Sequence, residues 1–236
     1  MVIKSSAAVG PSHIEPPPVP RGARRREEIV AVAEAVFLAQ GFTETTMSDV
    51  AARAGASKET LYRHFGSKED LFAEVVRNRA RCLRGRLEAD IERPDPLADV
   101  LRNLGINLLE AMTSPEVSSL LRLVVAEAPR DPAIGRIFYA LGPERTREQL
   151  TEVLEAAQAR GEFTGDRPAL AASIFLGAVV SQAHTARLVL QGLPPMGRDE
   201  IEERVDEVVA MFMGRYARVA AETSDSVDVA TAPRRV

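Results

Sequence analysis

The chain has 236 residues, of which 45% are hydrophobic and 27% charged, a composition typical of folded proteins with one large domain or two smaller ones. The formal net charge of −4 excludes a protein that binds nucleic acid through its overall charge, and leaves only a local basic patch for that purpose. Aromatic residues make up only 5% of the chain and Trp is absent, so the composition favours helices over strands.

The N-terminal segment is rich in proline and poor in large apolar residues, which predicts a disordered arm over residues 1–22. It lacks the apolar stretch of a signal peptide, and no run of the chain approaches the roughly 18 apolar residues of a membrane span. The only cysteine, Cys82, excludes an internal disulfide and a cysteine-rich metal site. We therefore expect a cytoplasmic protein with no membrane partner.

The next part of the chain predicts four helices, each bounded by cap residues or glycines. Apolar residues from Ile29 to Phe37 recur with helical spacing, and Gly41 supplies a left-handed end to the first helix. The second helix starts with Thr46 and has an acid, Asp49, three residues later, as in a capping box. The expected ranges are Arg24 to Gln40, Thr46 to Gly55, Ser57 to Gly66, and Ser67 to about Ile91.

The second and third of these helices are short and are separated by a turn that contains Gly55, which is the arrangement of a helix-turn-helix. In such a unit the second helix enters the major groove of DNA. Leu61 and Phe65 share one face of that helix and are expected to be buried, so Arg63 points away from the core. Outward donors on this helix suit the base edges and phosphates of a duplex.

From residue 94 onward the chain again predicts only helices. Prolines mark several helix starts, including Ser114-Pro115, Asp131-Pro132 and Gly142-Pro143, because the first helical position needs no N–H. The longest expected helices are Glu144 to Arg160, Asp166 to about Leu190, and Arg198 to Ala217. The predicted fold class is therefore all-α. A three-helix helix-turn-helix domain is joined by a long fourth helix to a C-terminal helical bundle, and residues 221–236 form a flexible tail.

Several motifs around the short helices belong to one recognisable pattern. They are Thr45-Thr46, Val50-Ala51, Ala54-Gly55, Ser57, Thr60-Leu61-Tyr62, His64-Phe65 and Ser67-Lys68-Glu69-Asp70-Leu71. At this spacing they resemble the DNA-binding signature of TetR/AcrR-type transcriptional regulators, over about Arg24 to Val76. The stretch from Leu121 to Leu190 is similar to one C-terminal subtype of that family. The resemblance implies a DNA-binding domain over residues 23–83 and a ligand-binding and dimerisation domain over residues 84–220.

The resemblance also implies which residues contact DNA. The residues expected at phosphates are Thr46, Tyr62, His64 and Lys68. The residues expected at or near base edges are Ser57, Lys58, Thr60 and Arg63. Ser48 occupies a position where an Arg often reads a base, so its reach is shorter. Glu59 either accepts from a cytosine amine or complements the helix dipole. The run Arg24-Arg25-Arg26 is either a solvated helix start or an arm that touches DNA.

The C-terminal part contains three further sets of candidate residues. Asn103, Asn107 and His184 are candidate ligand contacts, with ordinary structural roles as the alternative. A stripe with coiled-coil spacing on the last helix, together with residues of the preceding helix, is a candidate dimer seam, with packing inside one chain as the alternative. The seam residues are Phe175, Val179, Ala183, Ile201, Val205, Val208 and Phe212. The arginines of the fourth helix, at positions 77, 79, 81, 84 and 86, are expected on a solvated face.

The sequence shows none of the motifs H-E-x-x-H, G-x-S-x-G, G-x-x-x-x-G-K-[ST] or G-x-G-x-x-G, so we expect neither an enzyme nor a cofactor. We expect a homodimeric transcriptional regulator that binds double-stranded operator DNA. The resemblance implies a repressor that releases a palindromic operator when an unknown small apolar effector binds the C-terminal bundle. The alternative is a helical interaction or ligand-binding module that has lost DNA binding.

Overall fold

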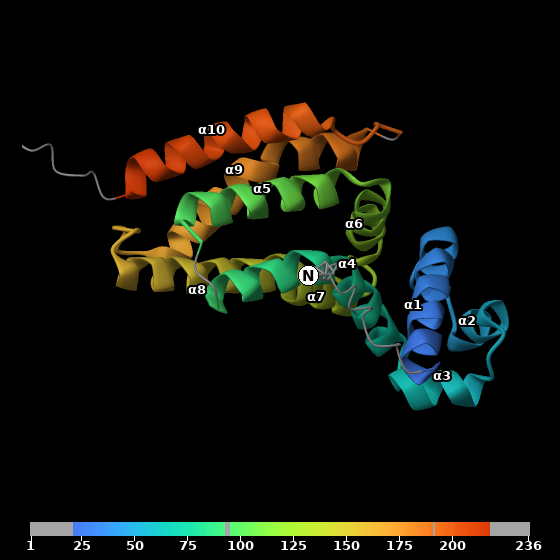
Figure 1. The fold of residues 1–236 in the computed structure, drawn as a ribbon. Coiled ribbons are helices and arrows are strands. Elements are labelled where there is room, and N and C mark those ends of the chain that lie inside the picture. The colour runs from blue at the N-terminus through green and yellow to red at the C-terminus, as the bar shows by residue number, and fades with distance from the viewer. Residues whose placement is uncertain (1–20, 93–94, 191, 218–236) are drawn as a thin grey trace, which may run out of the picture.

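The computed structural model describes residues 21–92, 95–190 and 192–217. The predicted arm, apart from residues 21 and 22, and the predicted tail over 221–236 lie outside these ranges. Figure 1 shows that all regular structure in the described ranges is helical, which confirms the predicted all-α class. The elements are α1 (Arg21–Gln40), α2 (Met47–Ala54), α3 (Lys58–Phe65), α4 (Lys68–Glu92), α5 (Leu97–Thr113), α6 (Pro115–Glu127), α7 (Pro132–Tyr139), η1 (Ala140–Glu144), α8 (Arg145–Arg160), α9 (Pro168–Val189) and α10 (Arg198–Tyr216).

Side-chain caps set the ends of the short helices where the sequence predicts them. The hydroxyl oxygen of Thr46 accepts from the backbone N–H of Asp49 at 3.2 Å, and the Asp49 carboxylate accepts from the N–H of Thr46 at 2.9 Å. Ser57 caps α3 by accepting from the N–H of Thr60 at 3.1 Å. Gly55, with φ of +59°, ends α2 in the left-handed conformation that glycine adopts without steric cost. These caps produce the tight turn between α2 and α3.

The region around Pro143 differs from the predicted helix start. Pro143 lies inside η1, a π-helical turn that joins α7 directly to α8. Proline has no N–H and its ring collides with the carbonyl four residues earlier, so a regular α-helix cannot continue through this position. The wider π turn accommodates the ring. Turns of this kind occur frequently at functional sites.

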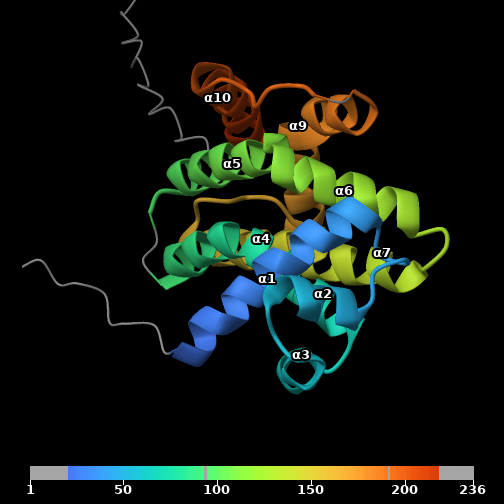
Figure 2. The ribbon, with the colours of Figure 1, turned by 90° about the vertical axis from the view of Figure 1, so that its right-hand side faces the viewer.

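The N-terminal helices share their core with part of the C-terminal bundle. Three phenylalanines, Phe37, Phe42 and Phe72, lie at its centre with ring centroids 5.3 to 5.8 Å apart. Leu120 of α6 and Ile134 of α7 are buried in the same core. Figure 2 looks at the molecule from this end, where α1 crosses in front of α4 and its C-terminal end lies beside α6. The helices α1 to α3, called the DNA-binding unit below, are therefore packed directly against the bundle.

A second core lies between α5, α8, α9 and α10, and the seven residues predicted to form a dimer seam are buried in it. Phe175 and Val179 of α9 and Val205 of α10 are completely enclosed within one chain, and the other four are at most 7% exposed. Gly105 of α5 allows this close packing, because a Cβ atom there would lie 2.7 Å from Cγ1 of Val205. The coiled-coil spacing thus reflects packing inside one chain, and these seven side chains are not available as a seam to a second copy.

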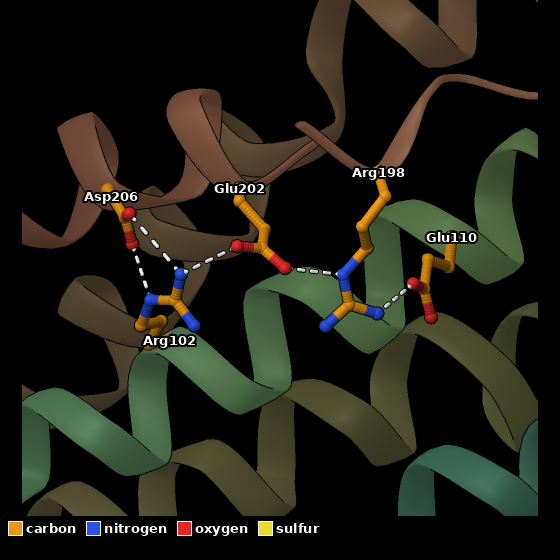
Figure 3. Close-up of polar contacts among 5 residues, drawn as sticks. All are labelled: Arg102, Glu110, Arg198, Glu202 and Asp206. Carbon is orange, nitrogen blue, oxygen red and sulfur yellow. Dashed lines mark hydrogen bonds and ion pairs between the residues drawn. The ribbon is translucent and has the colours of Figure 1, made fainter. Parts of the chain in front are cut away.

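Charged side chains also connect α5 to α10 at the surface (Figure 3). Arg102 of α5 donates from Nε to Asp206 at 2.6 Å and from Nη2 to Glu202 at 3.2 Å. Arg198 donates to Glu202 and, from its other side, to Glu110 of α5. The two guanidinium groups lower the pKa of the shared Glu202 carboxyl. Because all five side chains are exposed to solvent to a substantial degree, the network orients α10 more than it stabilises the fold.

The helix α9 is unusually apolar for its exposure. By length and composition alone it could cross a membrane. The mean hydropathy of its most apolar 18 residues is 1.4, and 28% of that stretch is buried. From the sequence we expected no run that approaches the length of a membrane span. Leu170 and Ile174 stand on its outer face, 43% and 52% exposed. The helix α9 packs against α5, α6, α8 and α10 and still leaves these two apolar side chains exposed to solvent.

Candidate DNA-binding surface and effector cavity

The exposed face of α3 has the chemistry of a groove-reading helix. Leu61 and Phe65 are buried, at 0% and 5% exposure, and fix the inner face of the helix. Lys58, Tyr62 and Arg63 stand on the outer side, with the Lys58 ammonium 5.8 Å from the centroid of the Tyr62 ring. The arrangement offers two cations and a phenol hydroxyl that can donate to phosphates and base edges.

The remaining predicted DNA contacts surround this helix. Thr60 and His64 of α3 are half-buried, Ser48 of α2 is exposed, and the cap residues Thr46 and Ser57 are exposed. The two cap hydroxyls are already engaged. That of Thr46 donates to the Asp49 carboxylate at 2.6 Å, and that of Ser57 lies 2.8 Å from the Thr60 hydroxyl. These five residues lie on α3 or at the starts of α2 and α3, and two of them, Thr46 and Ser57, also cap these helices.

Lys68 has a structural role that the sequence does not reveal. Its ammonium group donates to the backbone carbonyls of Phe42 at 2.8 Å and Thr43 at 3.2 Å, and it lies 4.4 Å from the centroid of the Phe42 ring. An ammonium has three N–H donors, so two of them hold the loop between α1 and α2 against the start of α4. One donor remains for a phosphate.

The basic run at the start of α1 is mostly used inside the protein. Arg25 donates to the backbone carbonyls of Ala54 at 2.6 Å and Gly55 at 3.1 Å, at the C-terminal end of α2. Arg26 pairs with Glu74 of α4 and lies 5.1 Å from the centroid of the Phe65 ring. Neither residue fits the two interpretations made from sequence, a solvated helix start or a DNA-touching arm. Only the side chain of Arg24, 79% exposed, remains open to both.

A cavity of about 350 Å³ lies among α4, α5, α6, α7, η1, α8 and α9. Its wall is predominantly apolar, with side chains such as Leu108, Met112, Leu120, Phe138 and Val180. Its volume is within the range of roughly 300–1,000 Å³ that is usual for small-molecule sites. The polar side chains on its wall are Arg79, Thr146, Ser181 and His184.

The structure separates the three predicted ligand contacts. His184 of α9 lines the cavity, and Nδ1 of its imidazole is buried with no hydrogen-bond partner. Burial lowers the pKa of His184, so the ring is neutral near pH 7. Asn103 and Asn107 lie outside the wall, because the side chains of α5 that reach the cavity are those of Leu108, Ala111 and Met112. The Asn107 amide instead donates to the carbonyl of Asn103 at 2.6 Å.

One cavity residue is bonded directly to the DNA-binding unit. Arg79 of α4 donates from Nε and Nη2 to the two carboxylate oxygens of Glu34 of α1, both at 2.7 Å. Glu34 is only 6% exposed. The prediction that Arg79 belongs to a solvated face is therefore wrong, since this side chain joins the cavity wall to α1.

A second connection runs through α6. Its C-terminal residue, Glu127, accepts from the backbone N–H of Thr43 at 3.0 Å and from the Thr43 hydroxyl at 2.5 Å. These two hydrogen bonds, with Arg130 and Lys68 nearby, lower the pKa of the Glu127 carboxyl. Val117 and Leu120 of the same helix line the cavity. The loop before α2 and the cavity wall are thus connected by one short helix.

The two parts of the chain match two described families. Residues 29–75 match the bacterial regulatory proteins of the tetR family, and residues 99–218 match the AefR-like transcriptional repressor C-terminal domain. The chain belongs to the TetR family of bacterial transcriptional regulators. Its members are DNA-binding regulators with a helix-turn-helix and are not enzymes, which confirms the family and the non-catalytic role expected from sequence.

Relatives within the TetR family support this assignment over most of the chain. The HTH-type transcriptional repressor BepR of Brucella suis biovar 1 is 27% identical over 168 residues, which cover 67% of this chain and 78% of BepR. A TetR-family regulator from Mesorhizobium loti has a similar structure, with a TM-score of 0.71 and 30% identity over 85% of this chain and all of that one. The flavonoid-responsive regulator FrrA is also 30% identical, with a TM-score of 0.67 over 84% of this chain and all of FrrA.

Proposed function

We propose that this TetR-family protein is a homodimeric repressor that binds a palindromic operator through α3 and releases it when a small, mainly apolar molecule fills the cavity. The observation that carries the proposal is the course of α4. This helix begins beside the reading surface at Lys68 and forms the cavity wall with Val76, Arg79 and Ala80. Eight residues of helix separate Lys68 from Val76, about 12 Å. A ligand that moves α4 therefore moves the DNA-binding unit with it.

The comparisons support repression, as opposed to activation, of the regulated genes. The C-terminal part matches a repressor domain, and BepR is named a repressor. Another relative, FasR of Mycolicibacterium smegmatis, 29% identical over 173 residues, is named an activator. FrrA is named flavonoid-responsive, which supports a small organic effector. Because operator DNA is the partner, we place the protein in the cytoplasm.

The predicted contacts to DNA are retained in the proposal. Phosphate contacts are assigned to Thr46, Tyr62, His64 and Lys68. Base-edge contacts are assigned to Ser48, Ser57, Lys58, Thr60 and Arg63. Tyr62 and Arg63 are both exposed and are the most informative to change, because neither side chain takes part in the caps or clamps that hold the unit together.

We assign the dimer contact to the outer faces of α9 and α10 in place of the buried residues predicted from sequence. Leu170 and Ile174 of α9 and Met211 of α10, 58% exposed, are among the large apolar side chains exposed on these helices. Covering them removes apolar surface from water, which favours association. Two copies would then place their α3 helices in successive major grooves, roughly 34–36 Å apart.

The proposal is tested by measuring binding of the full chain to the intergenic DNA beside its own gene, over a series of salt concentrations. We expect affinity to fall with salt. Tyr62→Ala should weaken binding to all sequences, and Arg63→Ala should reduce the preference for the operator. Arg136→Ala, an exposed arginine of α7, makes the same charge change away from α3 and should have little effect.

The same measurement separates the alternative function. Weak binding that is insensitive to salt and unaffected by Tyr62→Ala and Arg63→Ala would support an interaction module without DNA binding. Sedimentation of the free protein gives the oligomeric state independently, and Ile174→Asp should convert a dimer into monomers if the outer face of α9 is the contact.

A further inference from the structure

Arg79 is the only one of the described residues on the cavity wall that carries a permanent charge. The rest of the described wall is predominantly hydrocarbon and contains no carboxylate. A charged group buried against hydrocarbon without a partner is costly. A ligand with one charged group is therefore expected to place that group at the guanidinium of Arg79 and its apolar part against the remaining wall.

Glu34 engages only part of the Arg79 guanidinium. A guanidinium has five N–H donors in a planar fork. Glu34 accepts from Nε and from Nη2, both at 2.7 Å, so it occupies one edge of the group. Among the described residues, no acceptor engages Nη1 or the second N–H of Nη2. One N–H of each of these two nitrogens points in the same direction, and together they form a second edge of the fork.

The position of Glu34 indicates which side of Arg79 is turned to the cavity. Glu34 belongs to α1, and no residue of α1 lines the cavity. Its carboxylate is 6% exposed as part of a residue enclosed behind the wall. Because the edge with Nε faces α1, Nη1 lies on the side of the guanidinium that is away from Glu34. The second edge is therefore the part of Arg79 that is open to a bound molecule.

A carboxylate fits this second edge in both shape and charge. Its two oxygens accept from the two parallel N–H groups of a guanidinium, and hydrogen bonds between ions are roughly twice as strong as those between neutral groups. An amide or a ketone has only one oxygen to offer. A cationic ligand would meet the positive charge of Arg79 and no carboxylate on the described wall.

We propose that the effector is a monocarboxylate with an apolar body, and that its carboxylate binds the second edge of Arg79. This inference rests on the proposed function only in taking the cavity as the effector site. Two carboxylates on one guanidinium repel each other, so the bound anion weakens the hydrogen bonds from Arg79 to Glu34. The ligand thereby loosens the connection between the cavity wall and α1, through the one pair of side chains that joins Arg79 to the DNA-binding unit.

Three two-ring probes of similar shape test the proposal on the full chain. They are 2-naphthoate, the uncharged 2-naphthamide and the wholly apolar 2-isopropylnaphthalene, and their binding is measured by calorimetry at pH 7.5. We expect 2-naphthoate to bind at least about tenfold more tightly than 2-naphthamide, because only its hydrogen bonds to Arg79 join two ions. Binding of 2-isopropylnaphthalene reports whether the apolar part of the cavity is intact.

Glu34→Gln gives a prediction with a definite sign. The glutamine keeps the shape of the side chain and an oxygen that accepts from Arg79, but it removes the competing negative charge. Binding of 2-naphthoate should become at least about fivefold tighter, because the full charge of the guanidinium then acts on the ligand. The affinities of 2-naphthamide and 2-isopropylnaphthalene should stay the same. A merely structural role of the pair would give no such gain for the anion alone.

The loss of the guanidinium is tested in the double variant Glu34→Leu/Arg79→Met, which leaves no buried charge without a partner. It should bind 2-isopropylnaphthalene as the natural chain does and lose the preference for 2-naphthoate over 2-naphthamide. Arg136→Met removes an exposed arginine of α7 that does not line the cavity, and it should keep the full preference.

Each outcome decides for or against the carboxylate ligand. It is overturned by equal or tighter binding of 2-naphthamide, by no binding of 2-naphthoate, or by a preference that persists in the double variant. An effect of Glu34→Gln that is absent, or equal for all three probes, also overturns it. The proposed function is judged separately by operator binding without any probe. Operator binding without the preference would refute only the carboxylate ligand, whereas the preference without operator binding would refute the regulator.

Discussion

The guanidinium of Arg79, on the wall of the cavity, donates two hydrogen bonds of 2.7 Å to the buried carboxylate of Glu34 in the first helix of the DNA-binding unit. This pair connects the cavity to α1 through one side chain on each helix. The Thr43–Glu127 bonds connect the cavity to the loop before α2 through α6. In the proposed function, a ligand that binds one arrangement of α4 and α6 more tightly than another would change the orientation of α3 through these two connections.

Removing one member of the Glu34–Arg79 pair should destabilise the fold. Arg79→Met leaves the Glu34 carboxylate buried without its partner, and we expect the free energy of unfolding to fall by about 3 kcal/mol. The double variant Glu34→Leu/Arg79→Met removes both charges and should recover most of that loss. Urea unfolding of the natural chain, the two single variants and the double variant measures the interaction. Additive effects of the two single changes would show that the pair contributes nothing.

Much of the DNA-binding unit could be predicted from the sequence because its signals are local. The caps at Thr46 and Ser57 and the glycine at position 55 act within three or four residues, and they ended the helices where expected. The buried face of α3 followed from the spacing of Leu61 and Phe65. The structure places His184 on the cavity wall, and its role as a ligand contact stays a prediction.

Contacts between distant parts of the chain could not be predicted in the same way. Arg25 bonds to carbonyls 29 and 30 residues away, and Thr43 bonds to a carboxylate 84 residues away. Nothing in the pattern around either residue specifies such a partner, because any arginine or threonine at a helix end or in a loop looks the same in sequence.

The seven residues predicted to form a dimer seam show that an apolar pattern also leaves its packing partner undetermined. A stripe with coiled-coil spacing can be covered by a helix of the same chain or of another, and here α5 covers it.

Two helical glycines should respond in opposite ways to the same substitution. At Gly105 a Cβ atom would lie 2.7 Å from Cγ1 of Val205, so Gly105→Ala should destabilise the fold by about 1–3 kcal/mol through overpacking. At Gly177 a Cβ atom meets nothing within 4 Å, so Gly177→Ala should stabilise α9 by about 0.5–1 kcal/mol through helix propensity. Thermal unfolding of the two variants compares them directly.

A compensating change identifies the cause at Gly105. In Gly105→Ala/Val205→Ala the side chain that meets the new methyl group is shortened, and the double variant should lose less stability than the two single losses combined. If the losses add, then overpacking against Val205 is not what excludes a side chain at position 105.

Stability should fall in acid partly through Glu74. The hydrogen bond from Arg26 is the largest of the causes that lower the pKa of this carboxyl, and Arg77 acts in the same direction. A carboxyl with a lowered pKa binds fewer protons in the folded chain than in the unfolded one, so it stabilises the fold above its ordinary value of 4.5. That contribution is lost as the pH falls below 4.5 and through the folded pKa.

The variant Glu74→Gln tests this assignment by unfolding in urea between pH 7 and pH 3. The variant should be less stable than the natural chain at neutral pH, and the difference between the two should shrink as the pH falls. Glu203→Gln, an exposed residue of α10 with the same change of charge, should leave the shape of the pH curve unaltered. A constant difference across the range would assign the acid sensitivity to other carboxyls.

Two lysines at the DNA-facing end of the molecule should differ in what they do for the free protein. Lys68 donates to the carbonyls of Phe42 and Thr43, so Lys68→Ala should cost about 1–2 kcal/mol of stability, as expected for hydrogen bonds from a charged donor. Lys58 is exposed on α3, and Lys58→Ala should change stability by less than about 0.5 kcal/mol. Thermal unfolding without DNA measures both. Equal stability of the two variants would mean that the Lys68 ammonium does not hold the loop in solution and is free to reach a phosphate with all three donors.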